Sequence, residues 1–194
     1  MQKRVILITG TPAVGKTSLA KHLSETLDAQ YINLTELAKT KQFILEEDKE
    51  RQTLVIDEAK MRRKIRSIVN KAQKDIVIDG HYAAAVTPRT QATHVFVLRR
   101  HPQELREAMQ KRGYTQAKQK ENLEAEILDV CLVEALQKQP KALVCEIDAT
   151  SKTQNNLLAE VINVIEENKS CQANGINWLG KLEREGTLDQ YMKT

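Results

Sequence analysis

Gly10-Thr11-Pro12-Ala13-Val14-Gly15-Lys16-Thr17 is the stretch from which the architecture of this chain can be inferred. It matches G-x-x-x-x-G-K-[ST], the P-loop pattern. Its glycines let the backbone curl so that successive N–H groups point inward, at the start of a helix whose dipole also favours anions. In such a loop Lys16 is expected to reach the β- and γ-phosphates of a nucleotide, and the Thr17 hydroxyl to bind Mg²⁺. The residues expected to hold the phosphates are Ala13, Val14, Gly15, Lys16, Thr17 and Ser18.

The sequence on both sides of this stretch supports the P-loop interpretation. Val5-Ile6-Leu7-Ile8 directly precedes it and is typical of a fully buried strand. Leu19, Leu23 and Leu27 follow at helical spacing. Strand, loop and helix in this order are the context that the motif requires. The alternative is a glycine turn that closes an ordinary strand–helix unit.

Further strands alternate with helices along the chain. Strands are expected at residues 31–34, 76–79, 95–98 and 142–147, with a brief extended piece at 53–57. Helices are expected at 36–42 (capped by Thr35), 61–72, from Pro102 onward, 116–139 and 157–165. Residues 45–52 are mostly charged and are expected to form a mobile surface loop. We therefore predict an α/β, P-loop three-layer fold, a parallel sheet with helices on both faces and the ligand outside the carboxyl ends of its strands.

Composition narrows the class of protein. The chain has 194 residues, enough for one α/β domain, and a net charge of +4, which suits a phosphate-bearing ligand. Aromatic residues are only 4%, which argues against a base-stacking surface. Three widely spaced cysteines without a C-x-x-C pair argue against a zinc or disulfide framework and favour a reducing, cytoplasmic location. No apolar run approaches membrane-spanning length, so we expect no membrane partner.

Asp79 ends the apolar run Ile76-Val77-Ile78. A buried strand that ends in an acid is typical of a Walker B strand, whose carboxylate lies beside the P-loop and holds Mg²⁺ directly or through water. Thr17 and Asp79 are therefore the expected metal ligands. The alternative is that Asp79 only caps a turn with Gly80.

Two classes of small P-loop protein remain, a phosphoryl-transfer enzyme and a nucleotide-dependent switch. A guanine-nucleotide switch needs an N-K-x-D motif, and the sequence contains none. A nucleotide kinase needs positive charge around both bound nucleotides, because the transferred phosphoryl group is anionic. The candidate arginines are Arg89, Arg99, Arg100 and Arg112.

Three stretches resemble one known family, the atypical adenylate kinases of archaea and of the eukaryotic nucleus (the isoenzyme-six type). The first is I-L-I-T-G-T-P-A-V-G-K-T-S-L, which contains the P-loop. The second is I-V-I-D-G-H-Y, where Asp79 and His81 match the D-x-H element of the family. The third is R-G-Y-T-Q-A-K-Q-K-E-N-L-E-A-E-I, from Arg112 to Ile127, which is similar to the short lid of the family. The resemblance covers most of residues 1–165.

The resemblance implies a Mg²⁺-dependent kinase that transfers the γ-phosphoryl group of ATP to AMP or another nucleoside monophosphate, with accompanying ATPase activity. It implies a kinase domain at 1–167, with a monophosphate-binding segment at about 30–53 and a lid at about 111–121, and a C-terminal appendage at 168–194. It also implies roles for individual residues. Lys16, Asp79, His81 and Arg112 would be catalytic, Arg112 and Lys152 would bind ATP, and the AMP site would be lined by Thr35, Lys39, Arg89 and Arg99. His81 could instead be a simple hydrogen-bonded edge histidine.

The sequence departs from the family at two positions. Ala13 replaces a common glycine, which is tolerable if its φ is negative. Lys39 stands where ordinary adenylate kinases use an arginine, which puts the choice of monophosphate in doubt.

An alternative function is also implied by the resemblance, an ATPase that assists small ribosomal subunit maturation by binding a ribosomal protein and the pre-ribosome. The basic helix Lys60–Arg66, which could be only a solvated face, and the appendage are compatible with it. The apolar residues of the appendage could pack on the core or bind a partner.

Overall fold

The computed structural model describes residues 3–48, 53–167, 173 and 175–192. At its centre is a five-stranded sheet of order β2-β5-β1-β6-β7, and all neighbouring strands pair in parallel. Its strands are β1 (Val5–Gly10), β2 (Gln30–Asn33), β5 (Ile76–Asp79), β6 (His94–Arg99) and β7 (Val144–Asp148). All six residues of β1 are buried, as expected for a central parallel strand that is covered on both faces.

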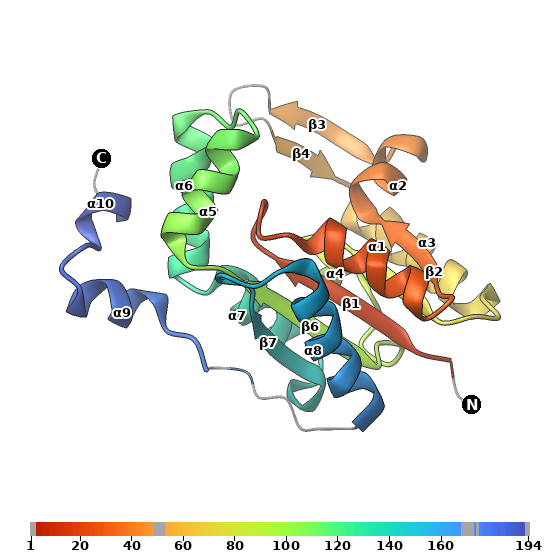
Figure 1. The fold of residues 1–194 in the computed structure, drawn as a ribbon. Helices are drawn as coiled ribbons and strands as arrows, with labels where there is room; N and C mark the ends of the chain where they lie inside the picture. Colours follow the sequence, from red (N-terminus) through yellow and green to blue (C-terminus); the bar gives the residue numbers. More distant parts are fainter. Residues whose placement is uncertain (1–2, 49–52, 168–172, 174, 193–194) are drawn as a thin grey trace.

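Helices cover both faces of the sheet, so the predicted three-layer architecture is confirmed (Figure 1). One face carries α1 (Lys16–Thr26) and α8 (Gln154–Glu167), and the other carries α3 (Glu58–Lys71), α4 (Ala83–Val86) and α7 (Val130–Lys138). Because side chains alternate along β1, Ile6 and Ile8 pack with the first group of helices, and Leu7 packs with the second.

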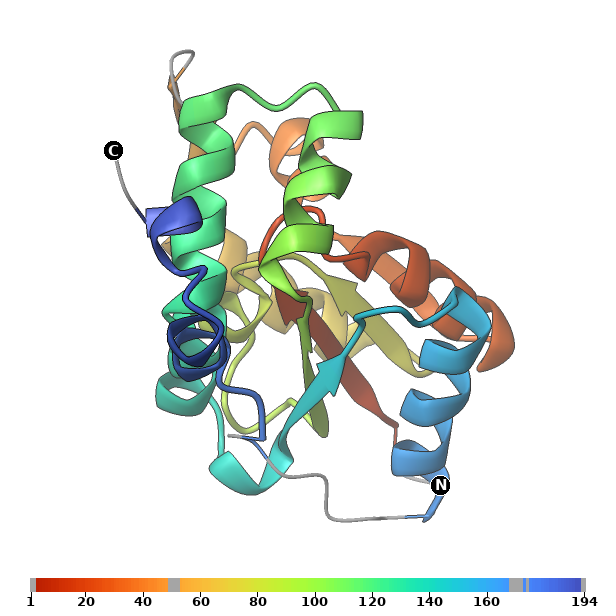
Figure 2. The ribbon, with the colours of Figure 1, turned by 60° about the vertical axis from the view of Figure 1, so that its left-hand side comes forward.

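A helical hairpin stands beyond the carboxyl ends of the strands. It consists of α5 (Pro102–Lys111) and α6 (Gln116–Ile127), which lie side by side in both views (Figures 1 and 2). Pro102 occupies the first turn of α5, where its missing N–H costs no hydrogen bond. The connection between the two helices, residues 112–115, falls within the predicted lid segment.

The segment between β2 and α3 differs from the prediction. Helix α2 (Leu34–Thr40) is capped by Asn33, whose Oδ1 accepts from the backbone N–H of Glu36, so the expected Thr35 cap is wrong. The charged stretch predicted as a loop forms part of an antiparallel hairpin of β3 (Ile44–Asp48) and β4 (Thr53–Ile56), and residues 49–52 lie outside the described part. Ile44, the first residue of β3, and Ile56, the last residue of β4, pair across the strands at the open end of this hairpin, which local charge does not reveal.

The single helix expected over 116–139 is two helices, α6 and α7. Asp129 breaks it, with φ +58 at the position preceding α7. The break interrupts the helical spacing of the apolar residues, so Leu128 is exposed rather than part of the buried stripe that the spacing predicted. Likewise β7 starts at Val144 because a short 3-10 turn, η1 (Lys141–Leu143), precedes it.

The appendage contains α9 (Trp178–Arg184) and α10 (Asp189–Met192). Trp178, Leu182 and Tyr191 are buried, and the last two belong to the core cluster of α1 and α8, so this part of the appendage packs on the core. Cys145 is disulfide-bonded, contrary to our expectation of no disulfide. Among the helices of the described residues, none has the length and apolar character needed to cross a bilayer.

Candidate nucleotide-binding site

The loop between β1 and α1 has the curled backbone that phosphate binding requires. Gly10 has φ +132, and a Cβ on it would lie 2.4 Å from the carbonyl oxygen of Leu98, so only glycine fits there. Gly15 has φ +110 and occupies the N-cap position of α1, where no side chain caps the helix. The N-terminus of α1 therefore offers main-chain donors and the positive end of its dipole to an anion.

Ala13 has φ +73, in the left-handed region. The condition under which we expected alanine to be tolerated, a negative φ, is therefore not met. An L-residue with a Cβ costs about 1–2 kcal/mol in this conformation. The loop keeps its curl despite that strain, and glycine at this position would relieve it.

Asp79 lies next to the loop. Its Oδ2 accepts from the Thr17 hydroxyl at 2.7 Å, from Asn33 Nδ2 at 2.9 Å and from the Tyr31 hydroxyl at 3.0 Å. Burial, together with the negative charge of Asp79, raises the pKa of Tyr31 to about 12, so the phenol remains a donor at neutral pH. The ends of β2 and β5 and the first turn of α1 thus meet at one carboxylate.

This arrangement suits Mg²⁺. Asp79 is 1% exposed and its three donors are all uncharged, so cations must balance its charge; Lys16 is near enough to interact with it, and a metal ion at the carboxylate would add to that balance. Hydroxyl and carboxylate oxygens are the ligands that Mg²⁺ prefers in proteins. Thr17 and Asp79 therefore fit the predicted metal ligands.

Lys16 points back to its own loop, where Nζ donates to the carbonyl oxygen of Thr11 at 2.8 Å. Burial lowers its pKa, the negative charges of Asp79 and Glu126 act in the opposite sense, and Arg112 adds to the lowering. Arg112, the predicted lid arginine, is the C-cap residue of α5 and so lies in the helical hairpin beyond the carboxyl ends of the strands.

His81 follows β5 and contacts the same region. The Thr9 hydroxyl donates to the His81 carbonyl oxygen at 2.8 Å, and the imidazole ring packs edge-on against Tyr82 with 4.7 Å between centroids. Burial among protein atoms, then the positive charges of Lys16 and Lys118, lowers the pKa of His81 to about 4. The residue is exposed by accessible area, so water screens part of this effect, but all three causes act in one direction. His81 is therefore neutral at pH 7.

The four residues expected to bind AMP do not lie together. Thr35 and Lys39 are both exposed on α2. Arg89 lies between α4 and β6. Two residues later, Gln91 bonds to Asn70 at the end of α3, so Arg89 lies toward the amino ends of the strands, whereas the P-loop follows the carboxyl end of β1. The structure therefore keeps Thr35 and Lys39 on the side of β2 and Asp79, and places Arg89 elsewhere.

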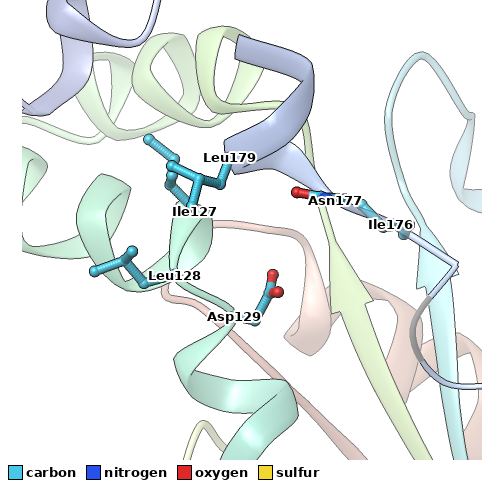
Figure 3. Close-up of a pocket in the computed structure, with 6 residues that line it drawn as sticks. All are labelled: Ile127, Leu128, Asp129, Ile176, Asn177 and Leu179. Carbon is cyan, nitrogen blue, oxygen red and sulfur yellow. The ribbon is translucent and has the colours of Figure 1, made fainter. Parts of the chain in front are cut away.

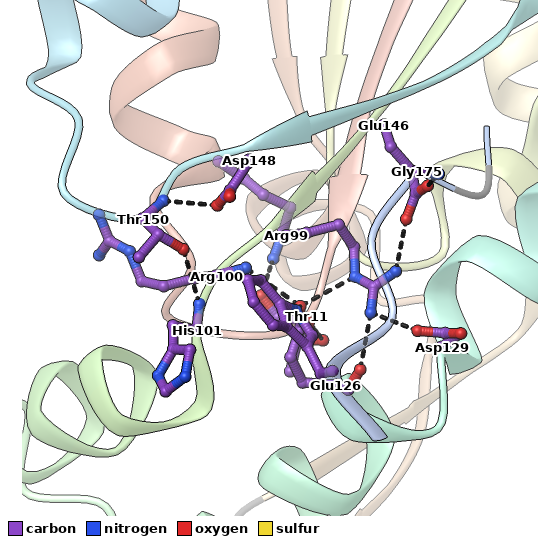
Figure 4. A network of polar contacts seen from close by, with 12 residues as sticks. Thr11, Arg99, Arg100, His101, Glu126, Asp129, Glu146, Asp148, Thr150 and Gly175 are labelled. Atoms are coloured by element: carbon purple, nitrogen blue, oxygen red, sulfur yellow. Dashed lines mark hydrogen bonds and ion pairs between the residues drawn. The ribbon is translucent and has the colours of Figure 1, made fainter. Parts of the chain in front are cut away.

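Arg99 is also placed differently from the expectation. Its guanidinium is 1% exposed and bonds Glu126 at 2.9 Å, Glu146 at 2.6 Å, and Asp129 (Figure 4). Burial alone would lower the pKa of Arg99, but Glu126 and Asp129 raise it, so the charge is permanent. With its donors engaged by carboxylates, Arg99 holds α6, α7 and β7 together rather than facing α2.

The loop after β7 lies beside the P-loop. Gln154, at the start of α8, has its amide nitrogen 3.5 Å from where a Cβ on Gly15 would be. Lys152, the residue expected near ATP, has Nζ bonded to Glu160 at 2.6 Å. The start of α8 thus lies close to the P-loop at Gln154, while the Lys152 side chain is directed to Glu160 of α8.

Sequence reasoning did not assign a role to several residues of this site. Tyr31 and Asn33 were predicted only as strand residues, although a polar residue at the carboxyl end of a strand beside a Walker B acid is a usable signal. Glu126 lies five residues after the predicted lid segment, in the same helix α6, and no local pattern distinguishes it from the other glutamates of that helix. Lys118 falls within the predicted lid, but its effect on His81 depends on tertiary structure.

A separate pocket of about 330 Å³ lies between the break after α6 and the start of α9, lined by Ile127, Leu128, Asp129, Ile176, Asn177 and Leu179 (Figure 3). Its polar groups already have partners, since Asp129 pairs with Arg99 and the Asn177 side chain caps α9 at Gly180.

Known proteins resemble this chain in sequence and in structure. The model of the family described as "AAA domain" matches residues 6–129. A protein of Methanocaldococcus jannaschii named "Putative adenylate kinase" is 38% identical over 184 residues, which cover 95% of this chain and 91% of the relative. Relatives with the same name from Pyrococcus furiosus and Saccharolobus solfataricus are 36% and 35% identical, over 90% and 97% of this chain and 91% and 95% of the relatives.

Solved structures agree on the fold. A shikimate kinase from Acinetobacter baumannii superposes with a TM-score of 0.63 at 14% identity, covering 87% of this chain and 96% of the other. A gluconokinase from Sinorhizobium meliloti superposes with a TM-score of 0.53 at 14% identity, covering 86% of this chain and 97% of the other. The parallel sheet with its P-loop and adjacent acid therefore defines a P-loop kinase fold. Within that class, the chain belongs to the family of archaeal proteins that carry the adenylate kinase name, as the resemblance implied.

Proposed function

We propose that this protein is a nucleoside monophosphate kinase that converts ATP and AMP into two ADP. The observation that supports this most directly is the junction at Asp79. One carboxylate oxygen accepts from Thr17 of the ATP-side helix α1 and from Asn33, which caps the monophosphate-side helix α2. Both substrates would therefore be positioned relative to a single buried group.

In this proposal the ATP phosphates lie in the main-chain curl between Gly10 and Gly15, with Lys16 and Arg112 balancing their charge. Mg²⁺ would be held by Thr17 and Asp79, and it would neutralise charge on the β- and γ-phosphates. A phosphate oxygen of AMP forms the new bond to the γ-phosphorus, and the bond from that phosphorus to the β,γ-bridging oxygen breaks, leaving ADP. The protein contributes position and electrostatics, because the reaction needs little else.

The AMP side would be α2 and the β3–β4 hairpin. Thr35 and Lys39 lie on the exposed face of α2 and are free of the buried network that engages Arg99. A lysine gives a phosphate one point charge rather than a two-pronged contact. We therefore expect AMP to bind more weakly than it would with arginine at position 39.

ATP hydrolysis is a second candidate activity, and the state of His81 favours it. Since its pKa is lowered to about 4, the imidazole is neutral at pH 7, so a ring nitrogen can accept a hydrogen bond from a water molecule and position it. A role in ribosome maturation, with a small-subunit ribosomal protein as partner, stays a prediction from the resemblance.

A coupled assay tests the proposal. ADP formation is measured with ATP, Mg²⁺ and each of AMP, GMP, CMP and UMP, and again without any monophosphate. We expect the fastest turnover with AMP, abolished by EDTA, and a slower AMP-independent hydrolysis. Protein that binds ATP in calorimetry yet forms no ADP from ATP and AMP would contradict the kinase proposal.

A further inference from the structure

Glu126, near the end of α6, joins four parts of the chain. Its Oε2 accepts from the Thr11 hydroxyl in the P-loop. Its Oε1 accepts from Arg99 Nε at 2.9 Å, from the backbone N–H of Arg100 at 3.1 Å and from the indole N–H of Trp178 at 3.1 Å. The Glu126 side chain is 1% exposed, so these contacts are shielded from water (Figure 4).

The C-terminal helices contact the helical hairpin at a second place. The Arg106 guanidinium of α5 lies 4.3 Å from the ring centroid of Tyr191 in α10, and it also donates to the carbonyl oxygen of Gln190. Tyr191 is buried in the same cluster as Met109 of α5 and Leu123 of α6. In both ribbon views α9 and α10 lie along the α5–α6 hairpin, on its side away from α1 (Figures 1 and 2).

We propose that Glu126 is a positioning residue that couples the C-terminal helix α9 to the P-loop, so that Trp178 both senses ATP at the loop and helps to set ATP affinity. The inference rests on the proposed function only in taking the P-loop as the ATP site. It assigns a role to the appendage within the catalytic domain.

The coupling follows from the chemistry of a buried carboxylate. Both oxygens of Glu126 are engaged, and a buried charge that loses a partner is costly, so Thr11 and Trp178 cannot shift independently. Phosphate bound in the curl would act on the backbone of Thr11, and the altered hydroxyl contact would then change the contact between Glu126 and Trp178. In the reverse direction, losing the indole donor would loosen the carboxylate that holds Thr11.

The first test uses the single tryptophan of the chain as reporter. ATP is titrated without Mg²⁺ or AMP at pH 8, where His101, 5.3 Å from the indole ring and with its pKa lowered by burial, is neutral. We expect a saturable shift in Trp178 emission whose midpoint matches the calorimetric Kd. Thr11→Ser keeps the hydroxyl and should retain the shift, whereas Thr11→Val should lose it. ATP binding without any emission shift, or an equal shift in Thr11→Val, would overturn the coupling; no ATP binding at all would instead contradict the proposed function.

The second test measures kinetics in Trp178→Phe, which keeps an aromatic ring but removes the donor. We expect KM for ATP to rise roughly three- to tenfold, because the lost hydrogen bond acts on the P-loop only through Glu126 and passes on part of its free energy, with kcat and KM for AMP within about twofold. Glu183→Gln, at an exposed position of the same helix, is the matched control and should leave all constants unchanged. A uniform loss of kcat together with a lower melting temperature and an unchanged KM for ATP would show a merely structural role and refute the proposal.

Discussion

The hydroxyl of Thr17 lies 2.7 Å from Oδ2 of Asp79, although 62 positions separate them in the chain. The contact joins the first turn of α1 to the carboxyl end of β5, which neighbours β1 in the sheet. It is the relationship expected of a P-loop hydroxyl and a Walker B carboxylate that share a magnesium ion.

Removing the charge of Asp79 should abolish most of the catalysis. Asp79→Asn keeps the shape of the side chain, but loses the charge and one acceptor, so we expect kcat for ADP formation to fall at least about a hundredfold. Thr17→Ser keeps the hydroxyl and should stay within about tenfold of the parent protein. Rates come from the coupled assay over a Mg²⁺ titration. A near-normal kcat in Asp79→Asn would leave only the turn-capping role for this residue.

Glycine at position 13 should stabilise the protein. Ala13 has φ +73, and relief of that strain outweighs the entropy that glycine gains in the unfolded chain. We expect Ala13→Gly to raise the free energy of unfolding by about 0.5–1 kcal/mol, measured by urea denaturation. Ala159→Gly, exposed in the middle of α8, should lower it by about 1 kcal/mol. Equal losses in both variants would mean that position 13 is not strained.

Arg99 should matter for folding rather than for AMP. Arg99→Met leaves Glu126, Asp129 and Glu146 without their shared cation, so the free energy of unfolding should drop by about 3 kcal/mol or more. Arg89→Met, at an exposed turn, is the control and should change it by less than about 0.5 kcal/mol. Normal stability of Arg99→Met with a raised KM for AMP would instead restore Arg99 as a substrate ligand.

With His81 in this state, the rate of ATP hydrolysis should stay constant down to an unusually low pH. The imidazole is active when neutral, and its folded pKa of about 4 lies below the ordinary value of 6.5, so protonation begins only as the pH falls toward 4. We expect the hydrolysis rate to stay level from pH 8 to about 5.5 in short assays on folded protein, whereas an ordinary histidine would already halve it near pH 6.5. The same lowered pKa means that the unfolded state binds the proton more readily than the folded state. The contribution of His81 to the free energy of unfolding is therefore fully present above about pH 6.5 and declines below it. His81→Gln should lower the rate at every pH; an unchanged rate would leave His81 a structural edge residue.

Local sequence is sufficient for the parts of this fold that depend on local patterns. The apolar runs at β1, β5 and β6 and the P-loop glycines predict the sheet, its alternation with helices and the curled loop between β1 and α1. Local sequence does not predict the elements whose structure depends on long-range contacts. Asp129, where the predicted helix breaks, pairs with Arg99, and the β3–β4 hairpin pairs Ile44 with Ile56; both contacts join residues that local pattern does not relate.

The same distinction applies to the site. Thr17 and Asp79 can be paired from the sequence, because both follow strands that end at one edge of a parallel sheet. Arg99 also ends such a strand, and only its three carboxylate partners, from α6, the α6–α7 break and β7, divert it from a ligand role. A charged residue at the carboxyl end of a strand can be predicted to lie at the ligand-binding side of the sheet. The sequence does not show whether its side chain contacts a ligand or forms a buried ion pair.

Asn33 uses both ends of one amide. Its oxygen accepts from Glu36 N at 3.0 Å, and its nitrogen donates to Asp79 at 2.9 Å. Helix-capping positions usually interchange freely among Asn, Asp, Ser and Thr, but Asp offers no donor here, and a short hydroxyl would have to serve two directions at once. Of these capping residues, only asparagine supplies both an acceptor for Glu36 and a donor for Asp79 at position 33 of this chain.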